Sequence, residues 1–311
     1  ITLNGFSYTS SAPKIYSFKA NLEDIVGNKD MISVLKKAVR NLLKYDPESK
    51  SNVMYTEFDG FQRTFTFYGP PGSGKSITIE ALLHEATEFA EKIGRPLEIE
   101  NVTNAFKSEY YSKSTQNLKE IFDRVREGDT ACILILDDID TILFSRNELD
   151  NRPEDKAILG TVMNYLEGIE APKFGNDLVI ATTNRPEILD NALFSRLSES
   201  VIYVPGPQIV DEYVQLFKIK LRKSIQNGLV KVNGKEWQDI GEECSRLRLS
   251  GRDVKNISRE LLERIYDAEE PEEVFSLTPA EQVQLLRSIY NPISANLFLK
   301  EIVEYRERIK V

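Results

Sequence analysis

Apolar residues recur along the first two thirds of the chain in two patterns. One repeats an apolar residue every three or four positions, which is the spacing of an amphipathic helix. The other is a short apolar run without alternation, as in residues 131–136, which is typical of a strand covered on both faces. Because such helices and strands alternate, we predict a parallel five-stranded α/β sheet with helices on both sides. The expected strands are 64–68, 97–100, 131–136, 178–181 and 201–204.

The helical spacing predicts where helices lie between these strands. The polar segment 45–60 contains Pro and Gly and is expected to be a loop, and residues 1–20 lack periodicity and are expected to form a lead-in segment. A helix is expected over 77–92. Three further helices are predicted from Ile32, Leu35, Val39 and Leu42, from Leu118, Ile121, Phe122 and Val125, and from Ile158, Val162, Tyr165 and Ile169.

The pattern changes at Pro205-Gly206-Pro207, after which strand signals nearly vanish and helical spacing dominates. Ser250 is expected to cap a helix, and Thr278 to Glu281 has the form of a capping box with Pro at the first helical position. We therefore predict three parts: a lead-in segment (1–20), an α/β domain (21–207) and a small all-α domain (208–311).

Composition narrows the class of protein. The chain of 311 residues has a formal net charge of −9, which disfavours broad attraction to nucleic acid or anionic membranes. No apolar run is long enough for a membrane span, no signal peptide is evident, and the initial Ile leads us to expect a part of a longer protein. Cys132 and Cys244 are expected to be buried thiols in the cytoplasm or another reducing compartment. His84, the single histidine, is expected on a helix surface and cannot form a zinc site or a Ser/His/Asp triad with so few partners.

The segment from Gly69 to Ser76 fits the phosphate-binding pattern G-x-x-x-x-G-K-[ST], between an expected strand and an expected helix. Glycines let backbone N–H groups point at a polyphosphate, and the helix N-terminus adds positive potential. We expect Lys75 to reach the β- and γ-phosphates of a nucleotide and Ser76 to bind Mg²⁺. The expected binding residues are Gly69, Pro70, Pro71, Gly72, Ser73, Gly74, Lys75 and Ser76.

A second candidate motif follows the buried strand 131–136. Asp137 lies where a Walker B aspartate holds Mg²⁺ through water, and its neighbour Asp138 lies where a base orients the attacking water. The alternative is an acidic helix N-cap, since Asp is favourable there in any protein.

With these motifs in order, the chain resembles the AAA branch of AAA+ ATPases, with a pattern similar to katanin and spastin. Segments 21–27, 69–76, 134–140, 179–186 and 189–196 look like the entry segment, Walker A, Walker B, sensor 1 and arginine-finger segments of that family. The resemblance implies a nucleotide domain with a helical lid, ATP and Mg²⁺ as cofactors, and a ring of identical subunits, commonly a hexamer. It also implies that Ile25, Val26 and Gly27 contribute to the nucleotide site.

The resemblance implies roles for three further residues. Asn184 would bind the attacking water or the γ-phosphate, with a loop cap as its alternative role. Arg196 would enter the neighbouring subunit's site and offset charge on the γ-phosphoryl group, with a surface arginine as the alternative. Arg252 lies where sensor 2 is found, and a solvated arginine of the first helical turn is its alternative.

Two departures from the family pattern bear on activity. The family usually has glutamate at position 138, and the shorter Asp138 predicts measurable but modest ATP hydrolysis. The expected pore loop carries Tyr110 and Tyr111, but Glu109 and Ser112 replace the usual basic residue and glycine. The resemblance implies an ATP-driven protein remodeller whose pore loop grips a polypeptide, with a nucleotide-gated assembly scaffold as the alternative. DNA handling is disfavoured by the acidic balance.

Overall fold

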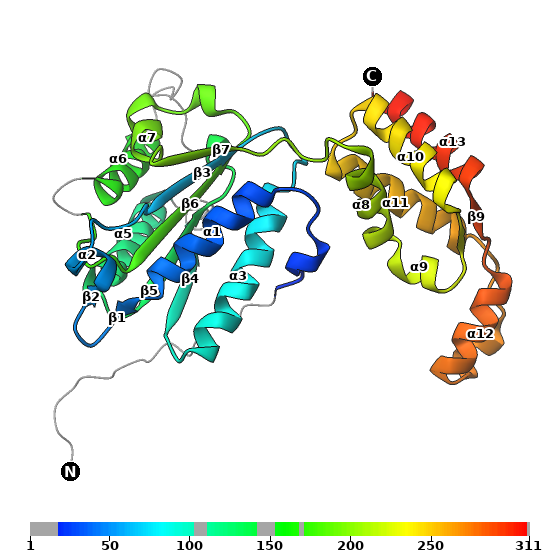
Figure 1. The fold of residues 1–311 in the computed structure, drawn as a ribbon, viewed down its shortest axis with the longest axis horizontal. Coiled ribbons are helices and arrows are strands. Elements are labelled where there is room, and N and C mark those ends of the chain that lie inside the picture. Colours follow the sequence, from blue (N-terminus) through cyan, green and yellow to red (C-terminus); the bar gives the residue numbers. More distant parts are fainter. Residues whose placement is uncertain (1–17, 103–110, 142–152, 168–170, 310–311) are drawn as a thin grey trace, which may run out of the picture.

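A computed structural model describes residues 18–102, 111–141, 153–167 and 171–309. The described chain has two parts side by side, an α/β part and a helical part, joined by the segment after β7 (Figure 1). This arrangement confirms the predicted fold class. The predicted domain boundaries at residues 20 and 207 remain predictions.

The α/β part is built on a five-stranded sheet of order β4-β5-β6-β3-β7 in which all pairs are parallel. All five strands were predicted: β3 and β5 have the predicted bounds, and the ends of the other three differ by at most two residues. Every residue of β5 and β6 is buried, as the unbroken apolar runs predicted. The strands are β3 (Thr64–Tyr68), β4 (Leu97–Asn101), β5 (Ala131–Leu136), β6 (Asp177–Thr183) and β7 (Ser200–Tyr203).

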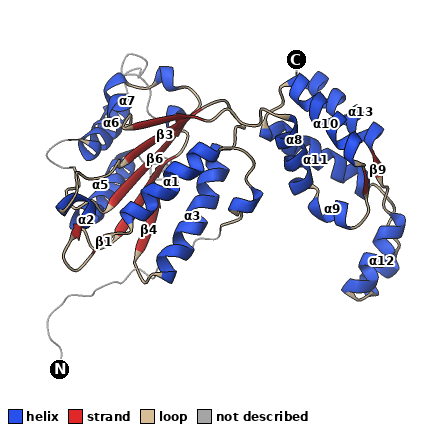
Figure 2. Cartoon of the chain, in the orientation of Figure 1, coloured by secondary structure: helices blue, strands red, loops and turns tan. Residues whose placement is uncertain are grey.

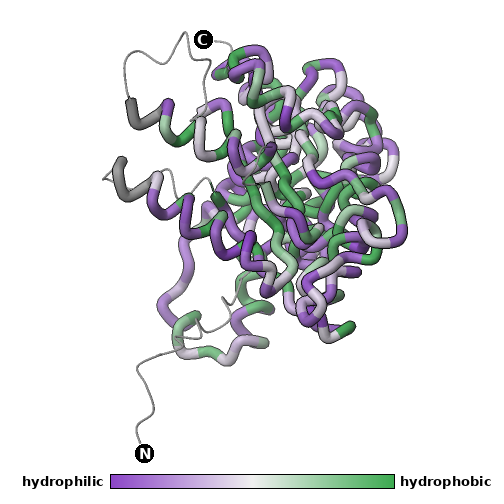
Figure 3. Tube along the Cα trace, turned by 90° about the vertical axis from the view of Figure 1, so that its left-hand side faces the viewer, coloured by the Kyte–Doolittle hydropathy of each residue, from purple (hydrophilic) through white to green (hydrophobic). Residues whose placement is uncertain are grey.

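Helices cover both faces of this sheet (Figure 2). Alternate residues of β5 point to opposite faces, so that Leu134 packs under α5, α6 and α7 whereas Ile133 and Ile135 pack under α1 and α3. Hydrophobic residues accordingly gather along the central strands in Figure 3. The elements are η1 (Leu22–Asp24), α1 (Lys29–Leu42), α3 (Lys75–Lys92), α5 (Tyr111–Glu127), η2 (Ile139–Thr141), α6 (Pro153–Leu166), η3 (Pro186–Ile188) and α7 (Asn191–Arg196). Ile169 lies outside the described residues.

The prediction of a loop over 45–60 was wrong in part. The segment forms an antiparallel pair, β1 (Tyr45–Asp46) with β2 (Ser51–Asn52), followed by the short helix α2 (Val53–Thr56). The fully buried Asn52 holds it in place, because its Nδ2 donates to the carbonyl oxygens of Asn41 (3.0 Å) and Gly175 (2.9 Å). A polar side chain that satisfies distant backbone groups leaves no periodic signal in the sequence.

The helical part has its own apolar core, formed mainly by α8, α10, α11 and α13. Its predicted caps are confirmed: Ser250 Oγ accepts from Asp253 N at 3.2 Å, and Thr278 N donates to Glu281 Oε2 at 2.9 Å. The elements are α8 (Val210–Lys220), α9 (Arg222–Gln226), β8 (Val230–Lys231), α10 (Gly234–Leu247), α11 (Gly251–Tyr266), η4 (Glu272–Ser276), α12 (Pro279–Ile289), β9 (Ile293–Ser294) and α13 (Ala295–Arg308). The two-residue strands β8 and β9 pair in parallel and were not predicted.

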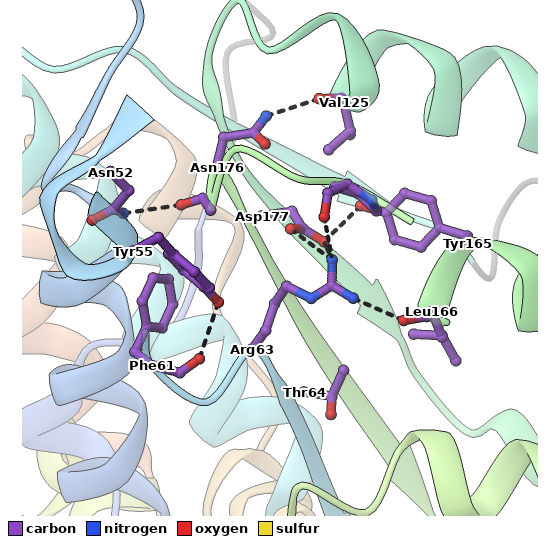
Figure 4. A network of polar contacts seen from close by, with 12 residues as sticks. Asn52, Tyr55, Phe61, Arg63, Thr64, Val125, Tyr165, Leu166, Asn176 and Asp177 are labelled. Atoms are coloured by element: carbon purple, nitrogen blue, oxygen red, sulfur yellow. Dashed lines mark hydrogen bonds and ion pairs between the residues drawn. The ribbon is translucent and has the colours of Figure 1, made fainter. Parts of the chain in front are cut away.

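A buried polar network joins the sheet to the end of α6 (Figure 4). Asp177, which is fully buried, accepts from Arg63 Nη1 (3.2 Å) and from the Tyr165 hydroxyl (2.7 Å). Arg63 Nη2 also donates to the carbonyl oxygen of Leu166 at 2.8 Å. Burial raises the pKa of Asp177, and Arg63 and Tyr165 oppose that rise by stabilising the carboxylate. The network fixes α6 at the sheet edge where β3 and β6 begin.

Both cysteines are free and buried, as predicted. Burial raises the pKa of both thiols. His84 lies on α3 as predicted, but it is half-buried rather than a plain surface residue, since its ring stacks on Phe18 with centroids 5.4 Å apart. Among the described residues, no helix has the length and apolar character needed to cross a membrane.

Candidate nucleotide site

The candidate site lies at the carboxyl ends of three neighbouring strands. β3 leads into loop 69–74, β5 into Asp137, and β6 into Asn184. Because parallel strands end at one edge of the sheet, these residues of distant sequence position meet there. The structure therefore brings together the phosphate-loop, Walker B and sensor 1 candidates.

Loop 69–74 needs glycine for both conformation and space. Gly72 has φ +80°, and a Cβ there would lie 2.8 Å from Ser250 Oγ and from Arg252 Cβ. A Cβ on Gly69 would lie 2.1 Å from the carbonyl oxygen of Val204. Backbone of this loop can therefore approach both β7 and the start of α11 only without side chains. A glycine-rich loop that leads into a helix N-terminus, as this one leads into α3, can present backbone N–H groups to an anion.

Lys75 opens α3, two residues before the predicted start of that helix, and its side chain is buried. Its Nζ donates to the carbonyl oxygen of Gly69 (2.8 Å) and to Asn184 Oδ1 (2.8 Å). Burial lowers the pKa of Lys75, and the carboxylates of Asp138, Asp140 and Asp137 oppose this shift. A buried ammonium held by neutral oxygens inside a backbone cradle is suited to a phosphate oxygen.

Ser76 and Asp137 form a pair of oxygen ligands beside Lys75. Ser76 Oγ donates to Asp137 Oδ1 at 3.0 Å, and the buried Thr182 donates to the same oxygen at 2.6 Å. A hydroxyl and a carboxylate in contact are the donor set that Mg²⁺ prefers. The residues present therefore fit a magnesium ion shared with nucleotide phosphates.

Asp138 occupies an unusual backbone conformation, with φ +49°. Its backbone N–H donates to Thr182 Oγ1 at 2.8 Å, and its Oδ1 accepts from Asn184 Nδ2 at 3.0 Å. Burial raises the pKa of Asp138, the nearby Asp137 and Asp140 raise it further, and Asn184 and Lys75 oppose the rise. Such an environment suits a carboxylate that accepts a proton.

A cavity of about 370 Å³ lies between the two parts of the chain, and its lining includes Lys75, Ser76, Asp138 and Asn184. Ile25 and Val26 line it from the α/β part, and the exposed Arg252, the second residue of α11, lines it from the helical part. Gly27, next to these residues, has φ +72° and turns the chain into α1. A cavity with phosphate-binding groups at one end and apolar side chains at the other can hold a nucleotide.

Arg196 lies apart from this cavity, and it is absent from the residues that line it. It ends α7, a short helix whose N-cap Asp190 accepts from Ala192 N (3.0 Å) and Leu193 N (3.1 Å). Its Nε lies 3.2 Å from Glu167 Oε2, and its Nη1 donates to the carbonyl oxygen of Ala192. Within one chain, Arg196 does not reach the nucleotide cavity.

Sequence reasoning missed several residues of the site. Asn28 Nδ2 donates to Thr78 Oγ1 (3.0 Å) and to the carbonyl oxygen of Ser73 (3.3 Å), which ties the entry segment to the phosphate loop. Asp140 Oδ1 accepts from Asn184 N at 3.0 Å. Thr182 could have been suspected from the sequence, because it places a hydroxyl at the end of an apolar strand. Lys220 and Lys255 also line the cavity, and no sequence pattern pointed to them.

The pore-loop prediction falls largely outside the described residues. Tyr110 is outside them, and Tyr111 is the first residue of α5, with no described side-chain position.

Comparison with protein families agrees with this geometry. The model of the ATPase family associated with various cellular activities (AAA) matches residues 65–227. The match covers more than half of the chain, and it spans the sheet from β3 to β7, the phosphate loop and the first helices of the helical part. With the site and the family match in agreement, the chain belongs to the AAA family of ATPases.

Proposed function

We propose that this protein binds ATP with Mg²⁺ in the cavity between its two parts, hydrolyses it slowly in a ring of identical subunits, and uses the energy to remodel proteins. One observation carries the proposal. Lys75, the Ser76–Asp137 pair, Asp138 and Asn184 meet at one end of a cavity that the helical part closes from the other side.

Loop 69–74 and Lys75 would hold the phosphates, and Ser76 and Asp137 would hold Mg²⁺, directly or through water. The ion, when bound, neutralises charge on the β- and γ-phosphates. Asn184 contacts both Lys75 and Asp138, which supports a role in orienting the base relative to the γ-phosphate. Asp138 would accept the proton of the attacking water.

Arg196 would complete the site from a neighbouring subunit. Its separation from the cavity of its own chain supports action across a subunit boundary. Arg252 would contact the γ-phosphate from the helical part and couple its position to the nucleotide state. The katanin- and spastin-like motif order favours a protein substrate, gripped by Tyr110 or Tyr111, and a hexameric ring.

The test compares variants that separate binding from hydrolysis. Lys75→Ala should lose binding of a fluorescent ATP analogue, whereas Asp138→Asn should keep binding and lose turnover. Turnover of the assembled wild-type protein equal to that of Asp138→Asn would refute hydrolysis by this site. An equal mass with and without ATP would refute nucleotide-dependent assembly.

A second candidate function is a nucleotide-gated scaffold that binds ATP and switches partners with little hydrolysis. The aspartate at position 138 favours it, because its carboxylate reaches one methylene less far toward the attacking water than the usual glutamate would. Replacing Tyr110 and Tyr111 with Ala separates the two functions. A remodeller should lose substrate processing and keep ATP binding, whereas a scaffold should keep its partner exchange.

A further inference from the structure

Helix α12 projects from the helical part (Figure 1), and the segment between α11 and α12 that leads to it is rich in acidic residues. We define the acidic arm as residues 267–276. Phe275 in this arm is 81% exposed, and α12, whose residues are all described, has no buried residue. The arm contains no Lys or Arg, and its acidic residues are Asp267, Glu269, Glu270, Glu272 and Glu273.

The carboxylates of the acidic arm have no cationic partner within the described chain. Glu270 Oε1 accepts from the Tyr290 hydroxyl at 2.6 Å, which is a neutral contact. No ion pair joins the other four to a Lys or Arg in the part of the chain that the structure describes. A run of exposed like charges beside a large exposed ring is a surface that a cationic partner with an apolar centre would cover.

The chain itself carries such a surface. A cleft of about 620 Å³ lies between α3 and helices α8, α9 and α11, and we call it the basic cleft. Its wall includes two carboxylates, Asp24 and Glu80, and apolar side chains such as Ile77 and Leu262. Five cationic residues line it: Lys19, Lys220, Arg222, Lys223 and Lys255.

Most of these cations are unpaired. Arg222 lies 2.7 Å from Asp24 Oδ1, but no ion pair holds the four lysines among the residues described. Tyr266, the residue directly before the acidic arm, lines the cleft of its own chain, but no residue of the arm itself does. Two complementary surfaces on one molecule can form a heterologous contact between copies, and such a contact can close into a ring.

We propose that the acidic arm of one subunit docks in the basic cleft of a second copy, with Phe275 entering the cleft between the lysines. This inference rests on the proposed self-assembly and specifies one of its contacts. Unpaired carboxylates then face Lys19 and Lys223, the two unpaired lysines of the cleft that do not also line the nucleotide cavity, and the exposed ring gains an apolar environment.

A charge-exchange experiment tests this contact. The arm variant is Glu272→Lys with Glu273→Lys, and the cleft variant is Lys19→Glu with Lys223→Glu, two lysines that do not line the nucleotide cavity. The readout is the protein concentration at half assembly, measured by mass photometry with ATP. Each variant alone should raise that concentration roughly tenfold, because like charges then face each other. A chain that carries all four substitutions should again assemble at a protein concentration close to that of wild type, because opposite charges face each other once more.

Controls separate this inference from the proposed function. Glu242→Lys with Gln238→Lys, on exposed positions of α10, alters charge elsewhere and should leave assembly unchanged. If wild type stays monomeric with ATP, the proposed ring fails. If wild type assembles and both charge variants assemble equally well, only the docking proposal is overturned. The docking proposal is also overturned if the arm variant alters the monomer but assembles at the same protein concentration as wild type.

Discussion

Among single residues, Thr182 does the most to organise the site. Its hydroxyl donates to Asp137 Oδ1 and accepts from the backbone N–H of Asp138, so that one buried group orients the carboxylate of Asp137 and holds the backbone of Asp138. It touches the reacting groups only through these two residues, which makes it a positioning residue.

Removing this hydroxyl should weaken the metal site. In Thr182→Val, which keeps the side-chain shape, we expect the Mg²⁺ concentration for half-maximal ATP hydrolysis to rise about 10- to 100-fold. Thr183→Val is the matched control, because Thr183 is equally buried but its Oγ1 accepts only from the backbone of Arg185. Equal Mg²⁺ dependence in both variants would contradict the role of Thr182.

Two requirements meet at position 138: the carboxylate must reach the attacking water, and the backbone must adopt a positive φ. Its positive φ is a conformation that Asp tolerates better than Glu. We predict that Asp138→Glu hydrolyses ATP faster, because the carboxylate reaches one methylene further, and that it unfolds at lower denaturant concentration, at a cost of about 1 kcal/mol. Steady-state turnover and urea unfolding would check both effects. Slower turnover in this variant would show that reach does not limit the reaction.

At the level of elements, the Arg63–Asp177 network anchors α6 to the sheet. Arg63→Leu would leave the Asp177 carboxylate buried without its cation, and we expect a loss of about 3–5 kcal/mol in the free energy of unfolding. Lys36→Leu, which breaks the exposed Lys36–Glu85 pair, should cost about 1 kcal/mol or less. Denaturant titration of both variants measures the difference, and equal costs would show that the buried pair is not needed.

The sequence predicted the elements whose signal is local. Runs such as 131–136 and spacings such as that of α1 depend on nearby residues, and Ser250 and Thr278 cap their own helices. The hairpin and helix within 45–60 depend instead on Asn52, whose partners include Gly175, far along the chain. The same holds at the site: motifs identified Lys75, Asp137 and Asn184, whereas the role of Asn28 depends on contacts with Ser73 and Thr78 that only the fold creates.

For the whole molecule, the separation of Arg196 from its own cavity leads to a test with mixed subunits. Arg196→Ala and Asp138→Asn should each be inactive alone. When they are mixed, an Asp138→Asn subunit can supply Arg196 to the intact cavity of its Arg196→Ala neighbour. We expect part of the ATP hydrolysis to return on mixing. A mixture as inactive as its components would mean that Arg196 does not act across the boundary.

The close approach of loop 69–74 to the start of α11 has a mechanical consequence. A Cβ on Gly251 would lie 2.9 Å from the carbonyl oxygen of Gly72, so the two parts meet here backbone to backbone. In this conformation the contact therefore limits how closely loop 69–74 and the start of α11 can approach each other. A methyl group at position 251 would force the start of α11 away from the backbone of Gly72, and Arg252, the next residue, would move with it. The separation of the two parts at this point is therefore set by the lack of a single carbon atom.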